Sequence, residues 1–100
     1  MNMQALMKQA QAMQRDITNA KNEIDNSVFE GKSSLVTVSV KGSKEIVDVS
    51  ILGDAKDLIA DDMSMLEDMI VLAINDAFSK VDKATEEKMG KYSNMMPGLF

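Results

Sequence analysis

Apolar residues recur along residues 63–81 at steps of three and four, which is the repeat of one face of an α-helix. The residues that carry this repeat are Met63, Leu66, Met69, Ile70, Ala73, Ile74, Ala77, Phe78 and Val81. Val71 and Leu72 widen the apolar arc beyond the roughly 100° stripe that one core contact requires. We therefore expect this helix to pack one flank on the chain's own sheet and another flank on a second copy of the chain.

A narrower apolar seam runs through residues 1–26, and no glycine or proline interrupts it. It consists of Met3, Leu6, Ala10, Met13, Ile17, Ala20 and Ile24. The alternating steps of three and four over three heptads are typical of a helix that packs along another helix. The pattern predicts one helix about 36 Å long, and we favour a helix–helix arm over the alternative of a helix lying flat on a sheet.

The segment between the two helices predicts an antiparallel three-stranded sheet. Residues 36–41 and 47–51 alternate apolar and polar side chains, as the two strands of a β-hairpin do. A two-residue Gly42–Ser43 loop of type II′ would join them, and a four-residue loop is the alternative. Either loop pairs Lys41 with Lys44, Val38 with Val47, and Val36 with Val49. Val28–Glu30 is expected to add a short edge strand before Gly31.

After the sheet, Asp54 is expected to cap a short turn through Ile59, and Asp61 or Asp62 to cap the long helix. We expect that helix to run to about Gly90 and residues 91–100 to form a loosely held tail. The order α-β-β-β-α predicts an α+β fold with two long helices, in a single domain over residues 1–100. Asn75 interrupts the apolar run, either as a buried hydrogen-bonding residue that aligns two subunits or as part of an exposed stripe.

The composition argues against an enzyme. The chain has no cysteine and no histidine, which excludes thiol nucleophiles, Cys/His zinc sites and the usual general base at neutral pH. An acidic cluster, Asp54, Asp57, Asp61 and Asp62, lacks the glycine and glutamate of an EF-hand loop and is better explained by helix capping. We expect no catalytic residues, no metal and no cofactor. No secretory signal or apolar run of roughly 20 residues is present, so we expect a cytoplasmic protein without a membrane span.

The net charge of −5 is unevenly distributed. Residues 53–78 hold one lysine against seven acids, whereas residues 1–26 are neutral and residues 79–100 carry a net charge of +1. The candidate DNA-binding residues therefore lie on the two helices: Lys8, Arg15, Lys21, Lys80, Lys83, Lys88 and Lys91. With only four aromatic residues for base stacking, the chemistry fits duplex phosphates better than single strands. The alternative is a set of ordinary surface lysines.

Four segments resemble the YbaB/EbfC family of nucleoid-associated proteins: LMKQAQAMQ (6–14), LEDMIVLAINDAFSKV (66–81), KMGKY (88–92) and MPGLF (96–100). The resemblance implies a tweezer-like homodimer of α-β-β-β-α subunits whose helical arms bind DNA. Lys8, Arg15, Lys80, Lys83 and Lys88 match the family's basic arm positions.

We therefore expect a non-enzymatic homodimer, associated with the nucleoid, that binds double-stranded DNA through its phosphates with little sequence specificity and affects nucleoid organisation or gene expression. The expected dimer interface comprises Val38, Val47, Val49, Leu66, Met69, Ile70, Ala73, Ile74, Ala77 and Phe78. The alternative is an acidic dimeric adaptor or chaperone that holds a helical client in the Met/Ala seam of residues 3–24.

Overall fold

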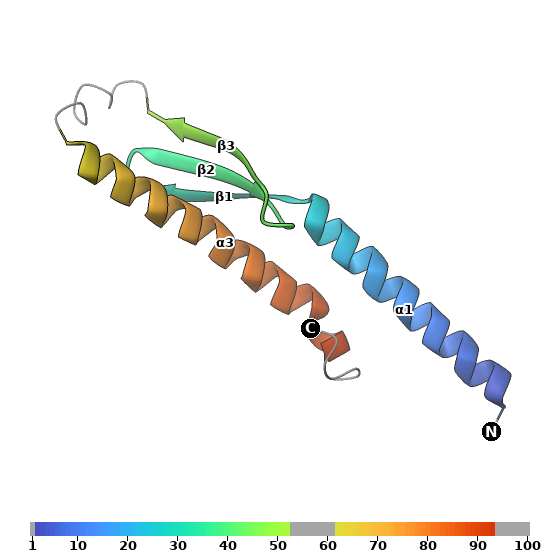
Figure 1. Ribbon diagram of the computed structural model, residues 1–100. Helices are drawn as coiled ribbons and strands as arrows, with labels where there is room; N and C mark the ends of the chain where they lie inside the picture. The colour runs from blue at the N-terminus through green and yellow to red at the C-terminus, as the bar shows by residue number, and fades with distance from the viewer. Residues whose placement is uncertain (1, 53–61, 94–100) are drawn as a thin grey trace.

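The computed structural model describes residues 2–52 and 62–93 (Figure 1). Its elements are α1 (Met3–Asn26), β1 (Val28–Ser33), β2 (Val36–Lys41), β3 (Ile46–Ile51) and α3 (Met63–Ser93). The predicted α+β class and the order α-β-β-β-α are confirmed. The turn expected from Asp54 to Ile59, the acids Asp54, Asp57 and Asp61, and residues 94–100 of the expected tail lie outside the described residues.

Both helices begin at a side chain that caps their first amides. The Oδ1 atom of Asn2 accepts a hydrogen bond from the Gln4 amide at 3.0 Å, and α1 starts at the next residue. The Asp62 carboxylate accepts from the Met65 amide at 3.0 Å, which confirms Asp62 as the cap of the long helix. That helix ends at Ser93, three residues beyond the end expected from the sequence.

The three strands form one antiparallel sheet in the order β1-β2-β3. The expected edge strand is longer than Val28–Glu30, because β1 pairs with β2 as far as Ser33. Gly31 therefore lies within the strand and does not end it. Its missing side chain allows α3 to approach, since a Cβ atom at this position would overlap backbone atoms of Ala73 and Ala77.

The predicted hairpin exists, but its register was wrong by two residues. Val38 lies opposite Val49 and Val36 opposite Ile51. The type II′ loop was also wrong, because Lys44 takes the left-handed conformation at φ 68° and Lys41 hydrogen-bonds the carbonyl of Glu45 at 2.8 Å. This longer loop shifts the register by one, and an irregularity between Ser39 and Val40 shifts it again. Because the two shifts together move the pairing by two residues, the same side chains still share a face of the sheet.

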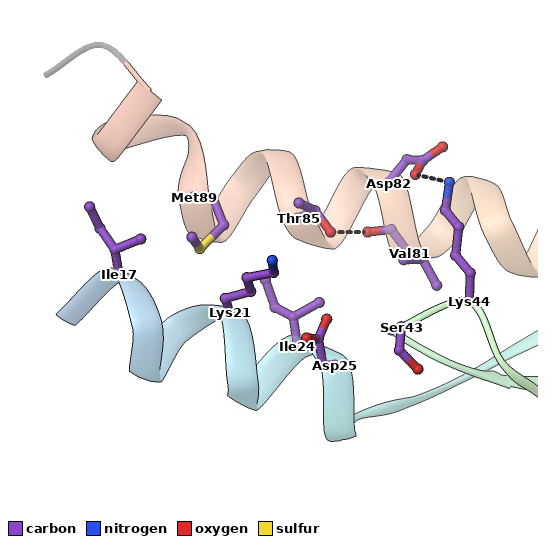
Figure 2. A pocket seen from close by; sticks show the side chains of 11 residues that line it. Ile17, Lys21, Ile24, Asp25, Ser43, Lys44, Val81, Asp82, Thr85 and Met89 are labelled. Atoms are coloured by element: carbon purple, nitrogen blue, oxygen red, sulfur yellow. Dashed lines mark hydrogen bonds and ion pairs between the residues drawn. The ribbon is translucent and has the colours of Figure 1, made fainter. Parts of the chain in front are cut away.

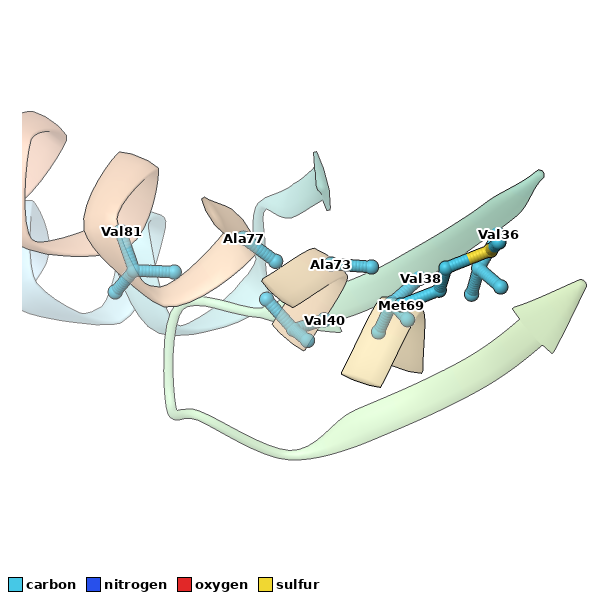
Figure 3. Packing of buried hydrophobic residues seen from close by; sticks show 7 residues of the cluster. All are labelled: Val36, Val38, Val40, Met69, Ala73, Ala77 and Val81. Carbon is cyan, nitrogen blue, oxygen red and sulfur yellow. The ribbon is translucent and has the colours of Figure 1, made fainter. Parts of the chain in front are cut away.

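The main core lies between α3 and one face of the sheet, over β1 and β2 (Figures 1 and 3). It contains Val36, Val38, Val40, Met69, Ala73, Ala77 and Val81. The three valines of β2 are fully buried, as are the two alanines of α3. Small alanines facing branched valines let helix and sheet pack closely, and each valine contributes about 1.5–3 kcal/mol through burial.

The molecule is elongated because α1 leaves the sheet and packs on α3 instead (Figure 1). It measures 71 × 19 × 14 Å, and its radius of gyration is 19.6 Å, whereas a compact chain of this length has about 13 Å. Ile17, Ala20 and Ile24 of α1 are buried against Met89 of α3, so the predicted helix–helix arm is confirmed. The N-terminal half of α1 continues past the end of α3.

Candidate nucleic-acid interface

The base of the arm is a cleft of about 540 Å³ between α1, the β2–β3 loop and the last turns of α3 (Figure 2). Its floor is apolar, with Ile17 and Ile24 on one side and Val81 and Met89 on the other. Gly42 of the loop donates its amide to the Ser27 carbonyl at 3.0 Å and packs on the end of α1. The direction of α1 is therefore fixed by packing on two other elements.

Two ion pairs lie at the sides of this base. One contains Lys88, which is a candidate DNA-binding residue, and the other contains Lys44, which is not. Lys88 of α3 contacts Glu23 of α1 at 2.5 Å, and Lys44 contacts Asp82 at 3.2 Å. The Lys44 ammonium also lies 5.7 Å from the centre of the Phe78 ring. Lys88 is thus part of the junction between α1 and α3.

Lys80 joins α3 to β1. Its ammonium donates to the carbonyl of Glu30 at 2.7 Å and pairs with Asp76 at 3.3 Å. Asp76 in turn accepts the backbone amide of Lys32 at 3.0 Å. The amide of Lys32 and then the charge and hydrogen bond of Lys80 hold the pKa of Asp76 below its ordinary value. Lys80 therefore has a structural role at the edge of the sheet.

Lys8 and Arg15 are placed differently from these paired lysines. They lie seven residues apart on α1, so they share one face of the helix, and both are exposed. The buried Ile17 and Ala20 lie on the opposite face, against α3. Residues 2–15 contain no acid, and within the described ranges 2–52 and 62–93 neither cation forms an ion pair. The arm thus presents two available cations in a row.

The seven candidate cations do not form one surface. Lys21 lines the cleft at the base of the arm. Lys83 is exposed and lies two residues after the buried Val81, so it faces away from α1. Lys91 is in α3, but its side chain is outside the described part of the structure. Among the candidates whose side chains are described, Lys8 and Arg15 are the pair that shares one exposed face near the free end of α1.

The contacts that tie Lys80 and Lys88 to other elements were missed in the sequence. Lys80 is 50 residues from Glu30, whose carbonyl it reaches, and Lys88 is far from Glu23 along the chain. Spacing within one helix indicates only neighbours three or four residues apart, so no local pattern could reveal these contacts.

The expected dimer interface divides into two groups. Val38, Met69, Ala73 and Ala77 are at most 8 % exposed within one chain, so they belong to the subunit's own core and are not available to a second copy. The other members are accessible. Val47 and Val49 of β3 are exposed, and Leu66, Ile70, Ile74 and Phe78 are half-buried along α3. Asn75 is exposed in the chain.

Within residues 2–52 and 62–93, no group of three or more acidic side chains is arranged to hold a metal ion. No helix in the same ranges is both long and apolar enough to cross a bilayer.

Fold and site together define a class of protein: a small α+β chain with an exposed apolar edge strand and a projecting helix that carries cations. Residues 1–96 match the model of the YbaB/EbfC DNA-binding family. The chain is 45% identical to a nucleoid-associated protein of Ligilactobacillus salivarius, over 99% of this chain and 95% of that protein. It is 38% identical to one of Enterococcus faecalis, over 98% and 94%. The chain belongs to the YbaB/EbfC DNA-binding family.

A solved structure supports the fold independently. The crystal structure of an uncharacterized protein from Helicobacter pylori matches with a TM-score of 0.68 over 96% of this chain and 98% of that one, at 21% sequence identity. The family description refers to DNA binding, and the comparisons do not favour the adaptor or chaperone alternative.

Proposed function

We propose that this protein is a non-enzymatic, nucleoid-associated homodimer that binds double-stranded DNA through its phosphates, with little sequence specificity. The observation that carries the proposal is the cationic arm. Lys8 and Arg15 project from a part of α1 that has no acid in residues 2–15, and the family is a DNA-binding family. Long cationic side chains on a helix bind phosphates, and phosphate contacts carry no base information.

A second copy of the chain would cover the apolar surface that α3 leaves open on β3. Ile46, Val47 and Val49 are 44–46 % exposed on this strand, and β3 has no partner on its outer side in the described sheet. Burial of such a strand and of the neighbouring flank of α3 removes both apolar surface and an unpaired sheet edge from water. The dimer would then present two arms to one duplex.

DNA binding is tested by the salt dependence of the affinity for a random duplex. We expect the logarithm of the binding constant to fall linearly with the logarithm of the salt concentration. In the double variant Lys8→Ala/Arg15→Ala the slope becomes shallower by about 3.6, at about 0.9 for each of four phosphate contacts in the dimer. The control Lys32→Ala/Lys41→Ala removes the same charge from the sheet and leaves the slope unchanged. A shallower slope in the control alone would place the DNA on the sheet.

Dimerisation is tested by sedimentation at micromolar concentration. Val49→Lys places a charge on the apolar face of β3 and should dissociate the dimer. Ser50→Lys introduces the same residue on the opposite face of that strand and should not. A folded, monomeric wild-type chain would refute the dimer without bearing on the arm's affinity for DNA.

A further inference from the structure

The apolar seam of α1 is only half covered. Its C-terminal members Ile17, Ala20 and Ile24 are buried against α3. Its N-terminal members Met3, Leu6 and Ala10, which we call the free seam, are exposed, with Met3 at 71 % and Leu6 at 39 %. Three heptads of one continuous seam thus begin without cover and end inside a core, which is unusual for an apolar strip on a small protein.

The end of α3 is directed along this strip. α3 runs antiparallel to α1, and its last described turns lie beside the middle of α1 (Figure 1). Tyr92 and Met89 pack in the cluster that also contains Met13 and Ile17. The chain after Ser93 therefore begins close to Met13, which is the seam residue that follows the free seam.

The segment that follows has the length and chemistry to cover the free seam. Residues 94–100 read NMMPGLF, in which Met95, Met96, Leu99 and Phe100 are apolar and no residue is charged. Seven extended residues span about 23–25 Å, whereas the helix from Met13 to Met3 rises about 15 Å. Methionine pairs well with this surface because its flexible side chain adapts to irregular apolar partners.

We propose that residues 94–100 bind the free seam of α1 in their own chain and so complete the apolar seam that α3 begins to cover. The bound segment lies on the face of α1 opposite Lys8 and Arg15, because those cations are on the far side from the buried seam. The arm then has one apolar face closed by the chain itself and one cationic face open. This inference does not depend on DNA binding.

Disulfide trapping in the full-length chain tests the position, since the wild type has no cysteine. In Leu6→Cys/Met96→Cys we expect an intrachain disulfide to form about tenfold faster than in the control Gln4→Cys/Met96→Cys. Gln4 lies two residues from Leu6 but on the opposite face of the helix. Equal rates in the two variants would overturn the proposal. So would fast cross-linking between separate Leu6→Cys and Met96→Cys chains, because it would mean that the segment binds another copy.

Methionine oxidation by peroxide provides a second measurement that does not require cysteines. In the full-length variant Phe100→Asp we expect Met3 to oxidise about threefold faster than in the wild type, because a charge weakens the cover of the free seam. Asn94→Asp adds the same charge to the same segment outside its apolar residues and should leave the rate unchanged. Met65, exposed on α3, is the internal reference. An unchanged rate for Met3 in Phe100→Asp would overturn the proposal.

Discussion

Gly31→Ala should destabilise the subunit because Gly31 lies where β1 and α3 approach closely. The added Cβ atom would overlap the carbonyl oxygen of Ala73 and the amide nitrogen of Ala77. These are backbone atoms of a packed helix, so no side-chain rotation can relieve the overlap. The helix must move outward by about 1 Å, and a gap of this size loses a quarter to a half of the contact energy around it.

Overpacked core sites usually cost about 1–3 kcal/mol, and a backbone overlap belongs at the upper end of that range. A loss of about 3 kcal/mol lowers the Tm of a chain of this length by about 12–24 °C. The measurement is thermal unfolding followed by circular dichroism at equal chain concentration, because the Tm of the proposed dimer would depend on concentration.

Gly90→Ala is the matched control, since it makes the same change in α3 where a Cβ atom would meet nothing within 4 Å. Alanine has a higher helix propensity than glycine, so this variant should be more stable by about 0.5–1 kcal/mol in its free energy of unfolding. A Tm for Gly31→Ala within a few degrees of the wild type would refute the close packing of α3 on β1.

Three further predictions concern an ion pair, a turn and the core. Because the pKa of Asp76 is lowered on folding, the ionised Asp76 stabilises the folded chain above pH 4, and this stabilisation is lost as the pH falls through the folded pKa. In acid titration, Asp76→Asn should therefore lose less stability below pH 4 than the wild type. Ser34 has φ 54°, so Ser34→Gly should raise the free energy of unfolding in urea by about 1 kcal/mol. A lower free energy of unfolding would contradict backbone strain at Ser34. Val38→Ala should lower the free energy of unfolding by about 2 kcal/mol in the same assay. A loss of less than about 1 kcal/mol would mean that neighbouring side chains fill the cavity left by the substitution.

The elements could be predicted from the sequence because each has its own signal. The seam from Met3 to Ile24 and the cap at Asp62 define the two helices, and the alternating valines define β2. The hairpin register could not be predicted, because it depends on Lys44 adopting a left-handed conformation in place of Gly42. Glycine indicates where such a conformation is permitted and does not show where it occurs.

The site was less predictable than the fold for a related reason. Positions three, four or seven apart identify cations that share a face of one helix, as Lys8 and Arg15 do. The same rule cannot show that Lys88 meets Glu23 or that Lys80 reaches the Glu30 carbonyl, since these contacts join different elements. Tertiary pairing therefore removes lysines from the candidate set that sequence spacing alone would retain.

The net charge of −5 does not exclude DNA binding, because several acids of the described residues lie in the first half of α3 or just before it, away from Lys8 and Arg15. They are Asp62, Glu67, Asp68 and Asp76, whereas Asp16 lies on α1 beside Arg15. Glu67 is in the first turns of α3, and the N-terminal half of α1 continues past the other end of that helix (Figure 1). From Glu67 to Ser93 the helix alone rises about 39 Å, which is about five Debye lengths at physiological salt. Within one chain, the acidic end is therefore screened from a duplex bound at Lys8 and Arg15.

Single neutralisations of charge test this argument directly. Asp16→Asn removes an acid next to Arg15 and should tighten binding to a random duplex about threefold at physiological salt, since the carboxylate lies within one Debye length of the bound phosphates. Glu67→Gln removes the same charge at the distant end and should leave the affinity unchanged. Both side chains are exposed, so neither change should affect folding. Fluorescence anisotropy at one salt concentration compares the two variants. An equal gain in both would mean that the duplex responds to the total charge of the molecule and that the arm is not where it binds.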